Sequence, residues 1–317
     1  MPLLSINNLT RTFGPITAVD HLSLDIEPGE LFGLIGPDGS GKTTALRMML
    51  GILTPDSGTG RVGGFDLIRE PESISSLTGY VSQRFSLYSE LTVEENLELF
   101  ADLYSVSEEE RLPRLQRLMQ FSRLDPFRTR PAGHLSGGMR QKLALSCALI
   151  HTPKLLLLDE PTTGVDPVSR RDLWKLLFDL WQEGVTIIVS TPYMDEAERC
   201  SRVGFLDQGK LVASGRPDEL RRAFRGAIIE IFADQRFAAK EVLASIQHVD
   251  DVNLFGEGLH ITIQGDAEAA AAEAKAALSS QGITIQSIRQ VDPSIEDVFF
   301  QLTGQRGQQD HPGLPNG

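Results

Sequence analysis

The sequence predicts an α/β protein with a mixed central sheet, followed by a smaller α+β domain. Mostly apolar runs at 31–35, 155–158 and 185–190 are typical of buried parallel strands. Helical patterns separate these runs, and from about residue 225 short segments follow in the order β-α-β-β-α-β. We therefore expect two domains, 1–224 and 225–304. The Gln-, Gly-, Pro- and Asp-rich stretch 305–317 is expected to be a disordered tail.

The N-terminal region alternates apolar and polar residues over 3–26, on both sides of a turn at Gly14 and Pro15. This pattern predicts a pair of antiparallel strands. The Gly- and Pro-rich residues 51–64 predict turns that lead into a short strand, and 77–83 predict another strand. Residues 84–152 have mainly helical spacing, so we expect an inserted helical lobe.

A glycine-rich loop separates the strand at 31–35 from a helix that starts near residue 45. It consists of Gly36, Pro37, Asp38, Gly39, Ser40, Gly41, Lys42, Thr43 and Thr44. This strand, loop and helix order is that of a P-loop, whose backbone N–H groups hold phosphates. We expect Lys42 to reach the terminal phosphates and the Thr43 hydroxyl to bind Mg²⁺. The pattern predicts that the chain binds a nucleoside triphosphate.

Two carboxylates follow the apolar strand at 155–158, at Asp159 and Glu160. In open α/β sheets ligands bind at the carboxyl ends of strands, so both side chains should lie near the phosphates. Asp159 is suited to hold Mg²⁺, and Glu160 is suited to orient and polarise an attacking water. The alternative, an acidic pair that merely faces solvent after a core strand, is disfavoured by the glycine loop.

A second anion-binding helix start is predicted at Ser136, Gly137 and Gly138. Ser136 has the position of an N-cap, and the helical spacing continues through residue 150. Taken alone, this stretch would be interpreted as an ordinary capped helix. With the glycine loop it offers a second helix N-terminus to a polyanion.

The remaining elements follow in order. Asp166 is expected to cap a helix over 168–183, before a buried strand at 185–190, a helical segment at 195–200 and a hairpin of 203–207 with 210–213. In the second domain we expect strands at 227–233, 252–255, 259–264 and 283–291, with helices at 238–247 and 266–280. This succession predicts a ferredoxin-like split βαβ fold.

Composition limits the possible partners. The 317 residues carry 30 Lys and Arg against 43 Asp and Glu, a net charge of −13, which opposes binding to nucleic acid. The two cysteines exclude a disulfide framework and favour a reducing compartment. The N-terminus has no signal-peptide pattern, and no apolar run reaches membrane-spanning length. We expect a protein that is soluble, or peripheral to a membrane through a partner.

Residues 3 to about 222 resemble an ATP-binding cassette (ABC) transporter ATPase. The resemblance rests on the order and spacing of four features: the glycine loop, Gln83, the stretch 135–141 and the strand that ends in Asp159 and Glu160. Residues 293–299 and the segment around them resemble the C-terminal domain of ATPases that serve ABC-2-type exporters. The resemblance implies a P-loop NTPase cassette with a mixed core sheet, an antiparallel β-subdomain and a helical subdomain.

Further roles are implied by this resemblance alone. Phe13 would stack on adenine, and Gln83 would contact Mg²⁺ and the water and sense the membrane partner. Ser136, Gly137 and Gly138 would contact ATP bound to an opposite cassette, and Asp166 would lie at that dimer interface. The implied partners are an ABC-2-type permease, a second cassette in a homodimer or heterodimer, and an adaptor in the periplasm. The implied location is the cytoplasmic face of the inner membrane, without nucleic acid.

One position departs from the family pattern. After the strand at 185–190 the family usually has a histidine that bridges the γ-phosphate and the catalytic carboxylate, and this chain has Pro192. Proline has no donor to offer a phosphate. Two hypotheses follow: Glu160 supports slow or partner-dependent hydrolysis, or the chain mainly binds ATP and supports a catalytically complete partner cassette. A soluble ABC ATPase acting on ribosomes or DNA is a third, less favoured interpretation because of the acidic charge.

Overall fold

The computed structural model describes residues 1–83 and 87–304. It divides into two compact units, Met1–Arg216 and a second unit that begins at Pro217. The second unit begins before the expected position 225 because α8 (Pro217–Arg222) packs against α11 (Ile295–Thr303). The expected tail at 305–317 lies outside the described residues. Over the described part of the chain, no helix has the length and apolarity needed to cross a bilayer.

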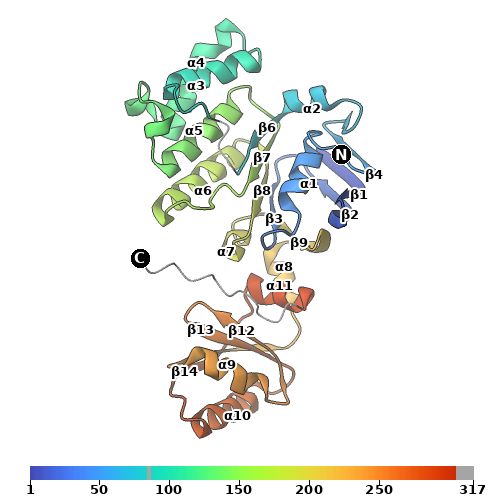
Figure 1. Ribbon diagram of the computed structural model, residues 1–317, viewed down its shortest axis with the longest axis vertical. Helices are drawn as coiled ribbons and strands as arrows, with labels where there is room; N and C mark the ends of the chain where they lie inside the picture. Colours follow the sequence, from blue (N-terminus) through green and yellow to red (C-terminus); the bar gives the residue numbers. More distant parts are fainter. Residues whose placement is uncertain (84–86, 305–317) are drawn as a thin grey trace. The chain divides into compact units, whose positions relative to one another are not determined.

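A six-stranded mixed sheet forms the centre of the first unit, in the order β10-β9-β3-β8-β7-β6 (Figure 1). Five strands run parallel: β3 (Leu31–Ile35), β6 (Thr78–Val81), β7 (Leu155–Asp159), β8 (Thr186–Thr191) and β9 (Arg202–Asp207). The sixth, β10 (Lys210–Gly215), forms the predicted hairpin with β9. β3, β7 and β8 are buried on both faces, which accounts for the apolar runs 31–35, 155–158 and 187–189 that they contain.

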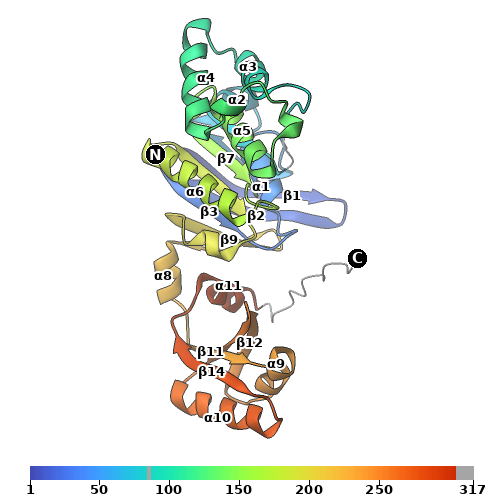
Figure 2. The same cartoon turned by 90° about the vertical axis from the view of Figure 1, so that its left-hand side faces the viewer.

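An antiparallel sheet lies beside this one, in the order β2-β1-β4-β5. It comprises β1 (Leu4–Phe13), β2 (Ile16–Ile26), β4 (Ser57–Val62) and β5 (Phe65–Asp66). Helix α1 (Lys42–Met49) packs into one apolar core with residues of both sheets, on the side of β1 and β2 (Figure 2). The predicted antiparallel subdomain is confirmed, and its core fixes the helix that follows the glycine loop.

The predicted helical lobe contains α3 (Val93–Leu103), α4 (Glu108–Ser122), two short 3₁₀ turns (Asp125–Phe127 and Ala132–His134) and α5 (Gly137–Leu149). Thr92 and Glu95 form a capping box at the start of α3, and Ser136 caps α5 by accepting from the Met139 N–H. Helix α6 (Pro167–Gln182) begins at the expected Asp166 cap, and α7 (Met194–Ala197) follows β8. The short helix α2 (Pro71–Leu77) precedes β6 and was not predicted.

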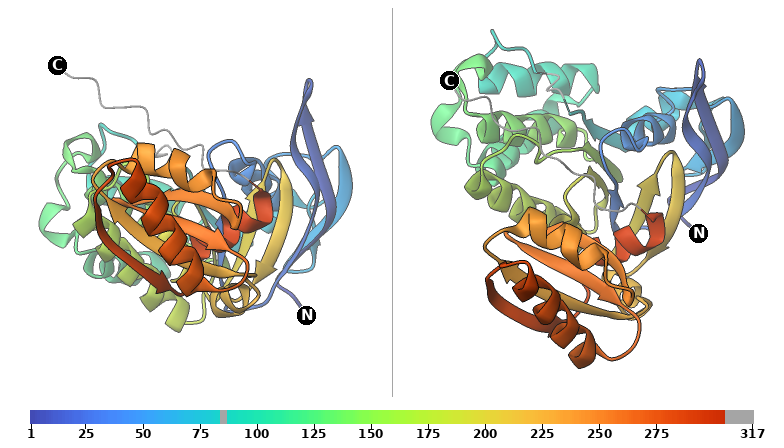
Figure 3. Two further views of the ribbon diagram at one scale, coloured as in Figure 1. Left: turned by 90° about the horizontal axis from the view of Figure 1, so that it is seen from below. Right: turned by 60° about the horizontal axis from the view of Figure 1, so that its bottom comes forward.

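The second unit has the expected ferredoxin-like order. Strands β11 (Ala227–Ala233), β12 (Val249–Phe255), β13 (Gly258–Ile263) and β14 (Ile285–Val291) form an antiparallel sheet in the order β12-β13-β11-β14. Helices α9 (Arg236–Ala244) and α10 (Ala267–Ser280) cover one face with an apolar core (Figure 3). Asp297 of α11 pairs with His260 of β13 at 2.9 Å, which ties this unpredicted helix to the sheet.

Candidate functional site

The glycine loop is held closely against its neighbours in the first unit. An added Cβ at Gly36 would lie 2.1 Å from the Leu206 carbonyl oxygen, and one at Gly41 would lie 2.1 Å from that of Ala18. Gly41 also has a φ of 104°, which L side chains rarely adopt. Glycine is therefore required at both positions by space, because β2 and β9 approach the loop backbone directly.

Lys42 opens α1 and is buried beneath the loop. Its Nζ donates hydrogen bonds to the Gly36 carbonyl at 2.9 Å and the Pro37 carbonyl at 3.0 Å. The same ammonium lies 3.1 Å from Oε1 of Glu160, and both side chains are less than one-tenth exposed. The lysine is thus oriented by carbonyls of the glycine loop and paired with the Glu160 carboxylate, which follows β7.

Asp159 ends β7 and accepts three hydrogen bonds. Thr43 Oγ1 donates at 3.0 Å and Ser190 Oγ at 2.8 Å to one carboxylate oxygen, and Tyr80 OH donates at 3.2 Å to the other. Burial, the larger cause, and the charge of Asp159 raise the pKa of Tyr80 to about 12, so the phenol remains a donor at neutral pH. These donors fix the carboxylate directly beside Thr43.

Glu160 follows in a strained backbone conformation, with a φ of 49°. Its N–H donates to the Ser190 carbonyl and hydroxyl at 3.1 and 3.0 Å, which secures the bend. Its side chain accepts from Gln83 Nε2 at 2.9 Å and Thr163 Oγ1 at 3.3 Å. Left-handed non-glycine residues of this kind cluster at active sites, where surrounding contacts offset the strain.

These residues fit Mg²⁺ and a nucleotide. Ser40 Oγ is buried in the loop and has no hydrogen-bond partner in the described part of the chain, so a donor or acceptor is left for a ligand. Thr43 and Asp159 supply the hydroxyl and carboxylate that Mg²⁺ takes beside substrate phosphates. No cluster of three His, Cys, Asp or Glu side chains suited to a metal occurs over residues 1–83 and 87–304. Phosphate oxygens and waters would complete a Mg²⁺ site here.

The structure therefore brings together Lys42, Thr43, Gln83, Asp159 and Glu160. The other loop residues surround them: Asp38 and Gly39 are exposed at the tip, and Thr44 is half-buried in the first turn of α1. Sequence reasoning missed a second set of residues that contact the two carboxylates: Tyr80, Thr163 and Ser190.

Two groups of predicted residues lie apart from this cluster. Ser136, Gly137 and Gly138 begin α5, and no hydrogen bond within the described ranges joins them to the glycine loop. Phe13 ends β1 with 47% of its surface exposed, and the Arg11 guanidinium carbon lies 5.0 Å from its ring centroid. Phe13 and Ser136 are exposed, whereas Gly138 is buried and an added Cβ there would lie 2.4 Å from Ser169 Oγ.

The segment that carries Pro192 is anchored by a buried carboxylate. Glu196 Oε1 accepts from Arg170 Nε at 2.6 Å and Trp174 Nε1 at 2.8 Å, and Oε2 accepts from Thr162 Oγ1 at 3.2 Å. Thr162 stands two residues after Glu160, so Glu196 connects the chain after β8 with the chain after β7. This connection was not predicted from the sequence.

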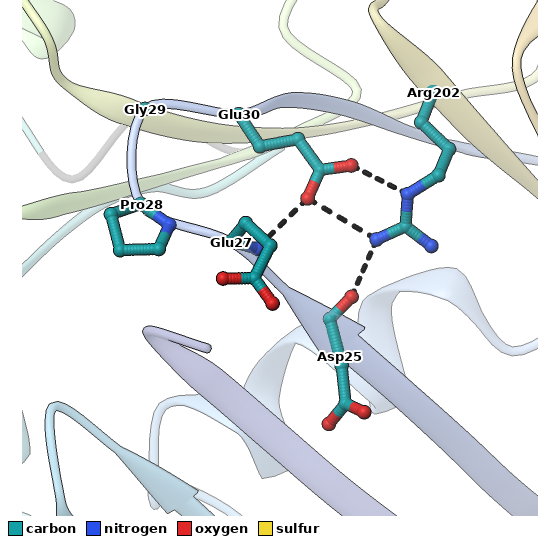
Figure 4. Close-up of a pocket in the computed structure, with 6 residues that line it drawn as sticks. All are labelled: Asp25, Glu27, Pro28, Gly29, Glu30 and Arg202. Carbon is teal, nitrogen blue, oxygen red and sulfur yellow. Dashed lines mark hydrogen bonds and ion pairs between the residues drawn. The ribbon is translucent and has the colours of Figure 1, made fainter. Parts of the chain in front are cut away.

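A separate surface hollow of about 490 Å³ lies at the turn between β2 and β3 (Figure 4). The Arg202 guanidinium there bonds to both carboxylate oxygens of Glu30 and to the Asp25 carbonyl, and the second Glu30 oxygen accepts from the Glu27 N–H. Arg202 and Glu30 thus satisfy each other, and none of the predicted site residues lines the hollow. We interpret it as a structural tie between β2, β3 and β9.

Comparison with known proteins places this site in a family. The model of the ABC transporter family matches residues 19–163, and the model of the C-terminal domain of DrrA1-3-like ATP-binding proteins matches residues 215–303. Nod factor export ATP-binding protein I from Cupriavidus metallidurans is 35% identical over 304 residues, 95% of this chain and 97% of that protein. The chain belongs to the family of ABC transporter ATP-binding proteins.

Other ABC ATP-binding proteins support the same assignment. Probable multidrug ABC transporter ATP-binding protein YbhF of Escherichia coli is 40% identical over 314 residues, covering 98% of this chain. The chain spans about half of YbhF, 54% of its length. A dimeric ATP-binding cassette solved in a post-hydrolysis state with ADP and Pi aligns at a TM-score of 0.61 with 27% identity, over 67% of this chain and 98% of that one. The ABC cassette fold predicted from the motifs is confirmed.

Proposed function

We propose that this chain is the ATP-hydrolysing subunit of an exporter, acting on a separate ABC-2-type membrane permease from the cytoplasmic face of the inner membrane. The observation that carries the proposal is the buried meeting of Lys42, Asp159 and Glu160 below a glycine loop. The names of its relatives, which concern multidrug and Nod factor export, support the direction of transport. The cassette would comprise the first unit, Met1–Arg216, so the expected boundary at 224 moves to 216, and the second unit would form an accessory domain.

Each side chain at the loop has a distinct task in this proposal. The backbone N–H groups of the loop and Ser40 Oγ would hold the phosphates, and Lys42 would neutralise the terminal ones. Thr43 and Asp159 would hold Mg²⁺, which supplies positive charge where the phosphate oxygens become more negative. Tyr80 keeps Asp159 in position by donating to its second oxygen.

Glu160 and Gln83 would act on the water that attacks the γ-phosphate. Glu160 lies at the carboxyl end of β7 with two hydrogen bonds to its side chain, so its free lone pairs are aimed rather than mobile. Gln83 Nε2 donates to it at 2.9 Å, which leaves the amide oxygen to accept from a water or to bind the metal. Orientation by both residues reduces the entropy lost on reaching the transition state.

A second cassette completes the proposed site. Ser136 is exposed and caps α5 through the Met139 N–H, and glycines in place of bulky side chains follow it at the positive end of that helix. Within the described residues, this helix start makes no hydrogen bond to the glycine loop of the same chain. We therefore infer that it faces ATP held by another cassette. The partner is a second copy or a related chain in a head-to-tail dimer, with Asp166 at the interface.

Two variants test this assignment. Isothermal titration should show ATP binding by the natural chain and its loss in Lys42→Ala, because the phosphates lose their buried cation. Glu160→Gln should retain ATP binding, lose hydrolysis by about 10²-fold or more, and form dimers in ATP and Mg²⁺ on size-exclusion chromatography. Full hydrolysis by Glu160→Gln, or unchanged ATP affinity in Lys42→Ala, would contradict the proposed roles.

Pro192 favours a second candidate, an ATP-binding cassette that supports a catalytically complete partner. It follows β8 at the position where the family usually has histidine, and its ring nitrogen has no hydrogen to donate. Losing one transition-state donor typically lowers the rate by about 10² to 10³. Single-turnover hydrolysis by Pro192→His and the natural chain tests this directly. Equal rates would remove Pro192 from the account and favour the first candidate.

Co-purification decides between transport and a soluble role. The tagged full chain should retain a membrane permease, with an adaptor in the periplasm as a further component. Ribosomes or DNA in place of a permease would overturn the exporter assignment.

A further inference from the structure

We propose that Arg11 and Asp56 form a fixed backing for Phe13, so that this ring holds the base of the nucleotide on one face only. The inference rests on the proposed ATP binding and deepens it, because it names the residues that set how much the base contributes to affinity. It is built from the end of β1, the turn into β2 and the residues just before β4.

Phe13 lies within a short stretch of strand from the glycine loop. It pairs across the hairpin with Ile16, and Ala18, two residues farther along β2, has its carbonyl against Gly41. Two residues of a strand span about 7 Å. The aromatic ring, which is 47% exposed, is therefore within reach of a nucleoside whose phosphates lie on the loop.

Arg11 covers part of this ring and is itself held in place. Residues two apart on a strand share a face, and the Arg11 guanidinium carbon lies 5.0 Å from the Phe13 centroid. Its Nη1 donates to Asp56 Oδ1 at 2.7 Å and to the Thr54 carbonyl at 3.1 Å. The guanidinium is therefore tied to the segment before β4 rather than free to move in solvent.

Asp56 grips the same strand at a second residue. Its Oδ2 accepts from the Thr12 N–H at 2.7 Å and from Thr12 Oγ1 at 2.6 Å. These two hydrogen bonds are the main reason that the pKa of Asp56 is lowered, which keeps the carboxylate charged for Arg11. One carboxylate thus holds both Thr12 and Arg11, and Arg11 is the residue that lies over the Phe13 ring.

The consequence concerns the base and not the phosphates. A cation over one face of an aromatic ring leaves the opposite face for stacking. We expect loss of the arginine to weaken base binding by no more than the energy of one such contact at a partly exposed site, which corresponds to about two- to fivefold in affinity. Arg11 acts on the nucleotide through Phe13, so it is a positioning residue. Its contribution should be absent for a ligand that carries the phosphates but no base.

The test measures dissociation constants for ATP and for ribose 5-triphosphate, with Mg²⁺, in the full chain. The natural chain should bind ATP more tightly than the baseless ligand. Arg11→Ala should weaken ATP binding about two- to fivefold and leave the affinity for ribose 5-triphosphate unchanged. The same substitution in a Phe13→Ala background should have no further effect on ATP. The matched control is Arg117→Ala, which removes an exposed arginine of α4 that pairs with Glu183. It should change neither affinity.

Three results would overturn the inference. Equal losses for both ligands in Arg11→Ala would show a purely structural role for the arginine. A full effect of Arg11→Ala in the Phe13→Ala background would show that the ring is not involved. Equal affinity of the natural chain for both ligands would show that the base is not held, while leaving the phosphate site intact. Failure to bind either ligand would instead remove the proposed function itself.

Discussion

Replacing Glu196 should destabilise the first unit, and alanine should destabilise it more than glutamine. Glu196 is fully buried and accepts from Arg170, Trp174 and Thr162. Alanine would leave the Trp174 N–H unpartnered, at about 1–3 kcal/mol, and would remove a charge-assisted bond to Arg170. Arg170 is 25% exposed and keeps its ion pair with Asp195. We therefore expect the free energy of unfolding to fall by about 3 kcal/mol in total, which is below the upper limit for breaking a buried pair. Glutamine can accept from Arg170 and Trp174 with its oxygen and donate from its NH2 to Thr162 Oγ1, which reverses that hydrogen bond, so a smaller loss of about 1 kcal/mol is expected.

The assay is urea unfolding followed by tryptophan fluorescence. The chain has two tryptophans, Trp174 and Trp181, and both lie on α6, so the signal reports the first unit alone. With a denaturant slope of about 2–3 kcal/mol/M, Glu196→Ala should lower the midpoint by roughly 1 M or slightly more. Glu183→Ala is the control, because its pair with Arg117 is exposed and contributes at most about 1 kcal/mol. A midpoint for Glu196→Ala as high as that of the control would refute the reasoning.

Three further predictions concern the loop, the metal and pH. Gly36→Ala should raise the Kd for ATP at least about tenfold, because its methyl group would lie 2.1 Å from the Leu206 carbonyl, and a natural Kd by titration calorimetry would contradict this. Tyr80→Phe removes one donor to Asp159 and should raise the Mg²⁺ concentration needed for half-maximal ATP binding about two- to tenfold, whereas a superimposable Mg²⁺ titration would exclude the role. Burial lowers the pKa of His151, so below its ordinary pKa the folded chain binds fewer protons than the unfolded chain. The stability that depends on neutral His151 is therefore present above a pH of about 6.5 and is lost as the pH falls through the lowered pKa. Between pH 7 and 5, the free energy of unfolding should fall less in His151→Phe than in the natural chain. Identical falls would argue against a role of His151 in acid destabilisation.

The strands and the loop could be predicted because their determinants are local. The runs at 31–35 and 155–158 are buried on both faces, so their apolar sequences alone reveal them. Gly36 and Lys42 belong to a short motif whose spacing is fixed by the phosphates it holds. The ferredoxin-like order of the second unit was visible for the same reason, since its strands and helices alternate clearly in pattern.

Contacts between distant segments could not be predicted in this way. Tyr80 and Ser190 donate to Asp159 from two different strands, and only the sheet order β6-β7-β8 places them on either side of it. Glu196 looks like any exposed helical glutamate in sequence, because its partners lie 22 to 34 residues away. Helix α11 carried a usable signal that was overlooked: Ser294 and Asp297 form a capping box.

The ion pair between Lys42 and Glu160 has a consequence for how such chains can change in evolution. Each residue neutralises the other inside the protein, so losing either one alone strands a buried charge. Bound phosphates can take over the role of the glutamate as counter-charge to Lys42, so we expect loss of the glutamate alone to be tolerated better than loss of the lysine alone. Pro192 is not part of that ion pair, so a change at position 192 leaves the pair itself intact.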